Sequence, residues 1–233
     1  MSTGRVILIG LVLGTGVLSF IPAQGRAAGE GGGSQGESVA GETQASAPLL
    51  ARLRAQFSER QAFRSPFVQT SHWAAFDEAD TSSGSLIVAP PDRFRLEYLE
   101  PAGHLIGSDG RFVWTFLPED RQVLRAHIEE TTNWGGFFYE ALEEAADSLA
   151  LFRADAEHGT VARIALRSRP EWGVNDLYVE VSPREALPVG YGYADEEGNR
   201  FRFSFHEPQF LPAVDEDLFR FRTPEGYELF EVD

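Results

Sequence analysis

The stretch at residues 112–117 constrains the fold more than any other, because it is apolar on both faces of the strand it would form. Phe112, Trp114 and Phe116 would share one face, and the residues between them are nearly as apolar. A strand of this kind must be covered on both sides. What covers the second face therefore bears directly on what the protein does.

The residues just before this strand predict further antiparallel strands. Phe94, Leu96 and Tyr98 alternate with charged residues, which is typical of a strand with one buried face. Pro101 interrupts the pattern, and Asp109-Gly110 predicts a hairpin with a type I′ turn, in which both central residues take positive φ.

The remaining chain continues in the same way. Apolar residues at helical spacing predict an amphipathic helix at 48–60 and a second helix at 134–151, preceded by capping residues at 131–133. Residues 77–83 are polar and predict a turn. Further strands are predicted at 63–76, 121–128, 161–166, 176–181, 187–194, 200–206, 218–221 and 227–232. The expected fold class is mainly β (α+β), a curled or closed antiparallel sheet of about ten or eleven strands with two helices.

The N-terminal region has the composition of an export signal followed by a linker. Residues 1–27 combine an early Arg5, an uncharged apolar run and small residues ending at Ala27, which indicates a cleaved signal peptide, with an uncleaved anchor as the alternative. Residues 28–47 are rich in Gly, Ser and Glu and predict a flexible linker. Residues 48–233 then form one domain. The chain has no Cys, so neither a disulfide nor a lipid-modified cysteine is available.

The charge of the chain excludes some partners. The formal net charge is −16, and all 20 basic residues are Arg. Such a surface repels phosphate backbones and anionic bilayers, so we expect no nucleic-acid partner and no electrostatic docking to a membrane.

No catalytic or metal-binding motif stands out. The Gly-x-Ser-x-Gly match at residues 32–36 lies in the polar linker, where no strained strand-to-helix turn is expected. The five histidines are dispersed, and there is no glycine-rich phosphate loop. We therefore expect a protein that is not an enzyme and that needs no metal or cofactor. A lipid-modifying hydrolase would require a nucleophile with a nearby base.

The aromatic content leaves two possibilities open for the interior. The chain has 18 Phe and 4 Trp, some on strands that are apolar on both faces. A curved sheet under an aromatic-faced helix encloses either a packed core or a cavity for an apolar ligand.

A set of short motifs, in a fixed order along nearly the whole domain, resembles the periplasmic outer-membrane lipoprotein carriers, the LolA family. The motifs are residues 67–70, 84–86, 91–98, 105–110, 122–123, 187–189, 198–199 and 218–226, with Pro101, Trp114, Pro118 and Asp195. The resemblance implies an incomplete β-barrel covered by helices. It also implies a soluble periplasmic monomer that takes acylated lipoproteins from an ATP-driven inner-membrane transporter to an outer-membrane receptor.

The resemblance also implies where the acyl chains bind. The lid helix would carry Phe137, Phe138 and Leu142. The cavity would be lined by apolar strand residues, namely Phe67, Leu86, Val88, Phe94, Leu96, Tyr98, Leu105, Trp114, Phe116, Phe201 and Phe203. Pro90 stands where family members often have a basic residue that helps to hold the lid closed. The alternatives are a lipid-binding or envelope-stress regulatory module on the same fold, and a structural domain with a filled interior.

Overall fold

A computed structural model describes residues 43–45, 47–59, 62–89, 92–128, 149–166 and 173–232. The predicted signal peptide, most of the linker and Pro90 lie outside the described residues. So does the helix predicted at 134–151 up to residue 148, with its capping residues and the lid residues Phe137, Phe138 and Leu142.

The elements follow one another as β1 (Thr43–Ala45), α1 (Ala47–Glu59), β2 (Ala62–Trp73), β3 (Glu78–Ala89), β4 (Arg93–Glu100), β5 (Leu105–Asp109), β6 (Phe112–Leu117), β7 (Gln122–His127), β8 (Leu149–Asp155), β9 (Gly159–Ala165), β10 (Asn175–Ser182), β11 (Leu187–Ala194), β12 (Arg200–Phe205), β13 (Gln209–Leu211), the 3₁₀ helix η4 (Glu216–Phe219) and β14 (Glu228–Val232). The helix predicted at 48–60 is confirmed as α1.

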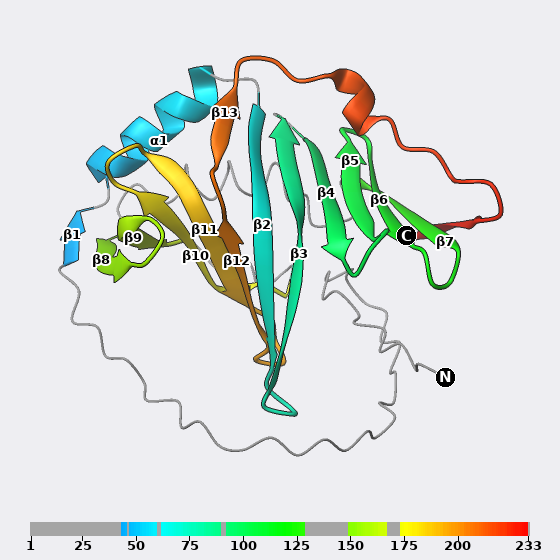
Figure 1. The fold of residues 1–233 in the computed structure, drawn as a ribbon, viewed down its shortest axis with the longest axis horizontal. Helices are drawn as coiled ribbons and strands as arrows, with labels where there is room; N and C mark the ends of the chain where they lie inside the picture. The colour runs from blue at the N-terminus through cyan, green and yellow to red at the C-terminus, as the bar shows by residue number, and fades with distance from the viewer. Residues whose placement is uncertain are drawn as a thin grey trace.

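The fourteen strands among the described residues belong to one curved sheet that does not close (Figure 1). Its order is β1-β8-β9-β10-β11-β12-β2-β3-β4-β5-β6-β7-β14, and β13 pairs with β2 beside this path. Neighbouring strands are antiparallel except β14, which runs parallel to β7. The predicted fold class is confirmed, with more strands than the sequence pattern indicates.

The long β2–β3 hairpin corrects one boundary. The sequence pattern predicts a turn at residues 77–83, yet residues 78–83 belong to β3 and pair with β2, from Ser83 opposite Val68 to Glu78 opposite Trp73. The turn is only four residues long, and Asp77 takes a φ of 51° there. Polar residues suit this part of β3 because most of it is exposed or only partly buried.

The β5–β6 hairpin forms where predicted, but its turn is not type I′. Gly110 has a φ of 92°, whereas Asp109 is not among the residues with positive φ. Asp109 Oδ1 instead accepts hydrogen bonds from the backbone N–H groups of Arg111 and Phe112, at 2.9 and 2.8 Å. Asp commonly stabilises turns in this way.

Three other segments differ from the prediction. Residues 149–151 begin strand β8 instead of ending a helix, and Thr43–Ala45 of the expected linker pairs with β8. Residues 216–219 form a 3₁₀ helix in place of the start of the strand predicted at 218–221, and Asp215 caps this helix by accepting from the N–H of Asp217. The β1–β8 pairing joins residues far apart in the sequence, and the 3₁₀ helix depends on the cap at Asp215. The alternation of apolar residues within a segment reveals neither contact.

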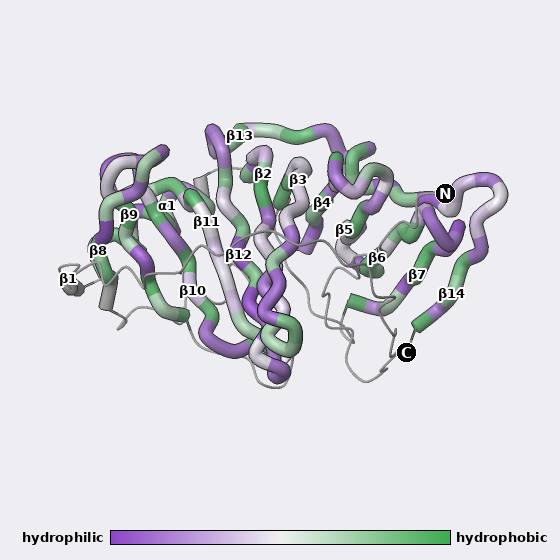
Figure 2. Tube along the Cα trace, turned by 60° about the horizontal axis from the view of Figure 1, so that its bottom comes forward, coloured by the Kyte–Doolittle hydropathy of each residue, from purple (hydrophilic) through white to green (hydrophobic). Residues whose placement is uncertain are grey.

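Strand alternation gives the sheet two distinct faces, and hydrophobic and hydrophilic residues alternate along the strands (Figure 2). One face, here called the aromatic face, carries Phe67, Phe94 and Phe203, and the helix α1 packs on it through its buried residues Leu49, Leu50, Leu53 and Phe57. Arg52 fixes the helix to the β10–β11 turn by donating to the carbonyl oxygens of Pro183 and Arg184, both at 2.8 Å.

Candidate functional site

The aromatic face runs without interruption across β4, β3, β2, β12, β11, β10 and β9. Registers place Tyr98 beside Gly84, Gly84 beside Phe67, and Phe67 beside Phe205. Its members form one hydrophobic cluster and expose 8% of their surface or less. The cluster therefore links strands that are far apart in the chain into one continuous apolar surface.

Gly84 allows the aromatic rings of the two neighbouring strands to meet. A Cβ at this position would lie 2.8 Å from the ring of Phe67 and 2.2 Å from the carbonyl oxygen of Glu97. The Phe67 and Tyr98 rings are perpendicular, with centroids 5.3 Å apart, a preferred aromatic geometry. The glycine in the 84–86 motif thus has a packing role.

The strand β11 supplies a second aromatic row. Tyr191 stacks on Phe203 and Tyr193 stacks on Phe201, each pair with ring centroids 4.9 Å apart. Both tyrosines are buried, and burial raises their pKa values well above the usual range. Sequence reasoning missed these two residues. The Gly-Tyr-Gly-Tyr alternation at 190–193 could have revealed them, because it predicts a strand with bulky aromatic side chains on one face and no side chains on the other.

A buried polar chain crosses the aromatic face. The Tyr98 hydroxyl donates to Gln69 Oε1 at 2.6 Å, and Gln69 Nε2 donates to Ser71 Oγ at 3.0 Å. Desolvation raises the pKa of Tyr98, which remains neutral at physiological pH. These bonds satisfy polar groups that would otherwise be costly to bury, and they fix the Tyr98 ring in position.

Most of the residues predicted to line a cavity come together on this face. Phe67, Val88, Phe94, Leu96, Tyr98, Phe201 and Phe203 belong to the buried cluster, and Leu86 packs against it. Phe63, Phe205 and the apolar side of α1 complete it, with Phe57 of α1 edge-on to Phe210 at 4.7 Å. These additional residues are not among those predicted.

The register separates Leu105, Trp114 and Phe116 from the other predicted residues. Gly107 pairs with both Arg95 and Trp114, and Arg95 points away from Phe94 and Leu96 because strand residues alternate. The three residues therefore lie on the opposite face, with Leu105 directly across from Phe116. The side-chain period of two makes this outcome sensitive to a register shift of one residue.

The C-terminal segment, residues 216–227, covers this part of the opposite face. Phe221 lies 6.3 Å, between ring centroids, from both Trp114 and Phe116. The guanidinium of Arg95 lies 5.9 Å from the centre of the Phe221 ring, and Arg93 lies 5.4 Å from that of Phe219. The two-faced apolar strand at 112–117 is thus explained, because Val113 joins the aromatic face and the C-terminal segment covers Trp114 and Phe116.

Within the described ranges, no group of three or more His, Asp or Glu side chains is placed to hold a metal ion. In the same residues, no helix is both long and apolar enough to cross a membrane.

Comparisons with known proteins place this fold. The family described as "Outer membrane lipoprotein carrier protein LolA" matches residues 58–222. The outer-membrane lipoprotein carrier protein of Halorhodospira halophila is 26% identical over 162 residues, covering 66% of this chain and 72% of the relative. That of Alkalilimnicola ehrlichii is 27% identical over 192 residues, covering 80% of this chain and 85% of the relative. The crystal structure of an uncharacterized conserved protein from Thermus thermophilus superposes with a TM-score of 0.51 at 15% identity, covering 81% of this chain and 100% of that one.

Proposed function

This chain belongs to the outer membrane lipoprotein carrier family, and on that premise we propose that it shelters the acyl chains of a lipoprotein against its aromatic face. The cargo class follows from the relatives, which are named as carriers of outer-membrane lipoproteins. The role is binding and release, with no covalent step.

The observation that carries the proposal is the continuous aromatic face from β4 to β11. An acyl chain of about 16 carbons gains on the order of 12 kcal/mol when it leaves water, at roughly 0.8 kcal/mol per CH₂. Phe67, Phe94 and Phe203 supply rigid apolar side chains for contact with such a chain. They are at most 3% exposed, so the chain enters only when the elements packed over this face move aside. Release in turn requires that the protein does not bind the chain much more strongly than the receiving partner does.

The path of the cargo is part of the same proposal. The carrier acts in the periplasm, receives the lipoprotein from an ATP-driven inner-membrane transporter, and delivers it to a receptor at the outer membrane. The net charge of −16 fits a carrier that moves between two anionic membranes without adsorbing to either.

A release assay tests the proposal. Purified protein is added to spheroplasts that hold a radiolabelled, acylated lipoprotein, and the supernatant is separated by size exclusion. We expect the lipoprotein to leave the membrane as a soluble complex with the carrier, and a non-acylated form of the same lipoprotein to give no complex. Recovery of the protein with free lipid only would refute the carrier function and support a lipid-binding or regulatory module on the same fold.

A further inference from the structure

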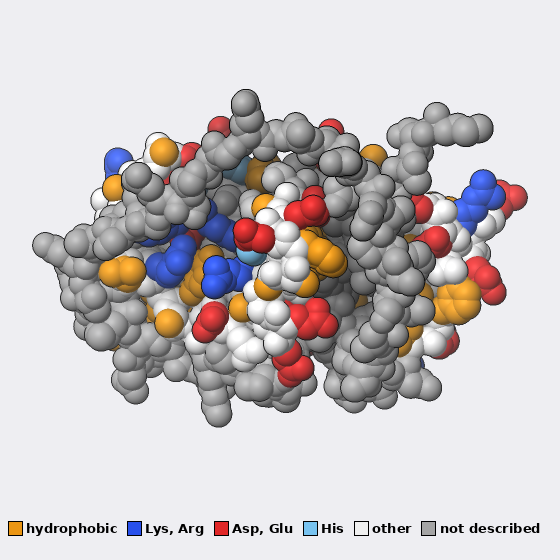
Figure 3. All heavy atoms as spheres, turned by 90° about the horizontal axis from the view of Figure 1, so that it is seen from below, with side chains coloured by type: hydrophobic (Ala, Val, Ile, Leu, Met, Phe, Trp, Pro, Cys, Tyr) orange, Lys and Arg blue, Asp and Glu red, His pale blue; other side chains and the backbone are white. Residues whose placement is uncertain are grey.

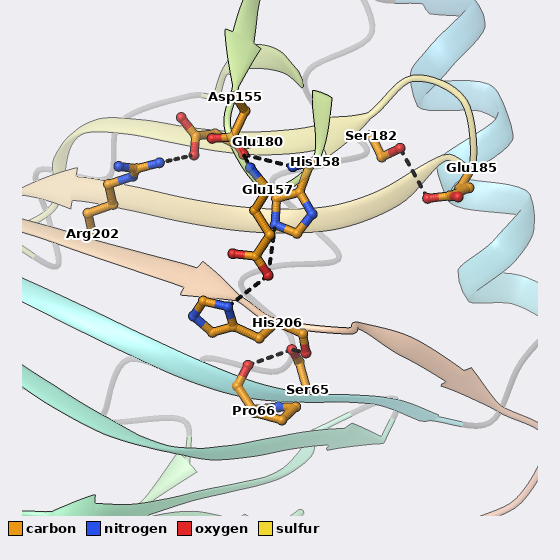
Figure 4. Close-up of polar contacts among 10 residues, drawn as sticks. All are labelled: Ser65, Pro66, Asp155, Glu157, His158, Glu180, Ser182, Glu185, Arg202 and His206. Carbon is orange, nitrogen blue, oxygen red and sulfur yellow. Dashed lines mark hydrogen bonds and ion pairs between the residues drawn. The ribbon is translucent and has the colours of Figure 1, made fainter. Parts of the chain in front are cut away.

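Three arginines from three strands converge on one buried carboxylate, on the face of the sheet opposite the aromatic face. Glu180 of β10 accepts hydrogen bonds from Arg163 of β9 through Nη2 at 2.7 Å and Nε at 3.1 Å. Arg202 of β12 donates to its other oxygen at 3.1 Å, as drawn in Figure 4. Arg153 of β8 also contacts Glu180 through Nη2. These four residues are called the arginine cluster.

Two glycines allow the arginine cluster to form. The strands β8 and β12 lie two positions away from β10 on either side, so Arg202 must reach across β11. Gly190 and Gly192 are the residues of β11 that lie between Glu180 and Arg202 on this face, and a Cβ at Gly190 would lie 3.1 Å from Glu180 Oε2. A Cβ at Gly192 would lie 2.4 Å from the Tyr178 hydroxyl. Without side chains there, β11 leaves room for the Glu180 and Tyr178 side chains to lie over it, between β10 and β12.

The arginine cluster carries surplus positive charge. Burial alone would raise the pKa of Glu180, but the hydrogen bond from Arg163 and the charges of Arg202, Arg163 and Arg153 outweigh it and lower that pKa below its usual value. Glu180 is therefore ionised at neutral pH, and three positive charges face one negative charge. Asp155 also lies near enough to Arg153 for the arginine to lower its pKa, although its Oδ1 is occupied by the backbone N–H groups of Glu157 and His158. Even with Asp155 counted, the balance is positive in a chain of net charge −16.

Glu180 has little capacity left to compensate these arginines. Its two oxygens already take four N–H contacts, which is about the number of lone-pair sites on a carboxylate. The Nε atoms of Arg153 and Arg202 are buried and have no hydrogen-bond partner among the described residues. Buried donors of this kind are uncommon and call for an explanation, such as a bound ion.

The arginine cluster is also accessible from solvent. The Glu180 side chain is 2% exposed, whereas those of Arg153, Arg163 and Arg202 are 23, 36 and 41% exposed. Figure 3 shows basic side chains gathered on the half of the molecule that carries β8 to β12. The Arg163 guanidinium rests on the Tyr178 ring, 4.0 Å from its centre, which restrains its orientation. The carboxylate thus fixes the guanidinium groups from below while their outer edges remain open.

We propose that the arginine cluster binds a phosphate group, with Glu180 serving to hold Arg153, Arg163 and Arg202 in position. A phosphate has several strong acceptor oxygens and accepts paired N–H donors from guanidinium groups, so it can bridge arginines that arrive from different strands. Its negative charge also matches the surplus that the carboxylate leaves. The bound group is either a soluble phosphate or phosphate ester, or the headgroup of a single phospholipid. This inference does not depend on the lipoprotein-carrier proposal.

Isothermal titration calorimetry on the whole protein tests the proposal, at pH 7 and constant ionic strength set with chloride. The probes are inorganic phosphate, short-chain phosphatidic acid below its micelle concentration, and the phosphatidylcholine of the same chain length. We expect saturable binding of phosphate or of phosphatidic acid that weakens in Arg202→Gln. Phosphatidylcholine, whose phosphate carries a single charge beside a cationic choline, is expected to bind only through its acyl chains and to be unaffected by Arg202→Gln. An affinity for phosphatidic acid that exceeds those for phosphate and phosphatidylcholine and that falls in Arg202→Gln identifies a lipid headgroup as the ligand, and equal dependence of phosphate and phosphatidic acid affinities on Arg202 identifies a soluble phosphate. No saturable binding of either anion would overturn the proposal.

Substitutions that are expected to change the affinity for phosphate in opposite directions locate the site. Arg202→Gln removes one partly exposed donor and should weaken binding about tenfold, the loss expected for a charge-assisted hydrogen bond. Glu180→Gln keeps one side-chain oxygen, Oε1, that still accepts from Arg163, and it removes the negative charge that competes with the phosphate, so it should strengthen binding. Arg222→Gln, an exposed arginine of the C-terminal segment, is the matched control and should leave the affinity unchanged. Binding that ignores the first two substitutions, or that responds equally to the third, would refute the site, and circular dichroism checks that each variant is folded.

Discussion

Substituting Gly107 by alanine should displace the Phe221 ring from the sheet. A Cβ on residue 107 would lie 2.2 Å from Cζ and 2.7 Å from Cε1 of Phe221, far inside van der Waals contact, and 3.0 Å from the carbonyl oxygen of Phe94. The backbone of β5 is held by β4 and β6, so the Phe221 ring must move. It then leaves Trp114, Phe116 and the guanidinium of Arg95.

The expected cost follows from what the Phe221 ring loses. Full burial of a phenylalanine side chain is worth about 1.5–3 kcal/mol, and this ring is only partly buried, so about 1–1.5 kcal/mol applies. The contact with Arg95 adds about 0.5–1 kcal/mol. Gly107→Ala and Phe221→Ala should therefore each lower the free energy of unfolding by about 2 kcal/mol.

A double-mutant cycle decides whether the reasoning is right. Urea unfolding of the wild type, both single variants and the double variant gives the four free energies. Because Phe221→Ala removes the ring that a methyl group at position 107 would strike, the double variant should lose about 2 kcal/mol and not about 4. Additive losses would show that Gly107→Ala destabilises the sheet for a reason unrelated to Phe221, such as the carbonyl of Phe94.

Three further predictions concern the two faces separately. Phe94→Glu should abolish acyl-chain binding, measured by release of lipoprotein from spheroplasts, because a charge would enter the aromatic face. The control Leu99→Glu, on the same strand and 66% exposed, should bind normally. Global unfolding of Phe94→Glu, seen by circular dichroism, would place Phe94 in a packed core instead. Tyr98→Phe should lower the free energy of unfolding, measured by urea denaturation, by about 1–2 kcal/mol, because Gln69 Oε1 loses its donor in a buried site. Tyr227→Phe is the control, and equal stability of the two variants would contradict the prediction. The pKa of Glu180 is lowered by folding, so its contribution to stability is present above the usual value of 4.5 and is lost as pH falls through the lower folded value. Wild-type protein should therefore lose stability below pH 4.5 more steeply than Glu180→Gln, and parallel pH profiles of their melting temperatures would refute the assignment.

The sequence predicts the aromatic face well where one strand contains the whole signal. Phe94, Leu96 and Tyr98 lie on one strand, as do Phe201 and Phe203, and both groups are buried as their alternation indicates. The pairing of neighbouring strands decides which of their side chains lie on the same face of the sheet. Alternation within a single strand does not reveal this pairing. For that reason the predicted cavity lining joins Trp114 and Phe116 to Phe94, although the pairing of Gly107 with both Arg95 and Trp114 sets them on the other side.

The arginine cluster could not be predicted from the sequence for a related reason. Arg153, Arg163 and Arg202 each look like an ordinary polar residue of an alternating strand, and they meet only because β8, β9 and β12 flank β10 in the sheet. The glycines at 190 and 192 are a local sign that side chains of neighbouring strands lie across β11 on this face. Their meaning depends on what the neighbouring strands place beside them.

The Gly-Tyr-Gly-Tyr segment of β11 makes the packing on both faces of the sheet depend on one register of β11 with its neighbours. If β11 slid by one residue along β10, Tyr191 and Tyr193 would turn toward Glu180 and Tyr178, and the glycines would leave gaps beside Phe201 and Phe203. An inserted or deleted residue in the four-residue turn between β10 and β11 would thus disrupt both the aromatic face and the arginine cluster on the opposite face. Length changes among related chains should be absent from this turn and tolerated at the tip of the β2–β3 hairpin, where the exposed side chains of residues 74–77 make no such double demand.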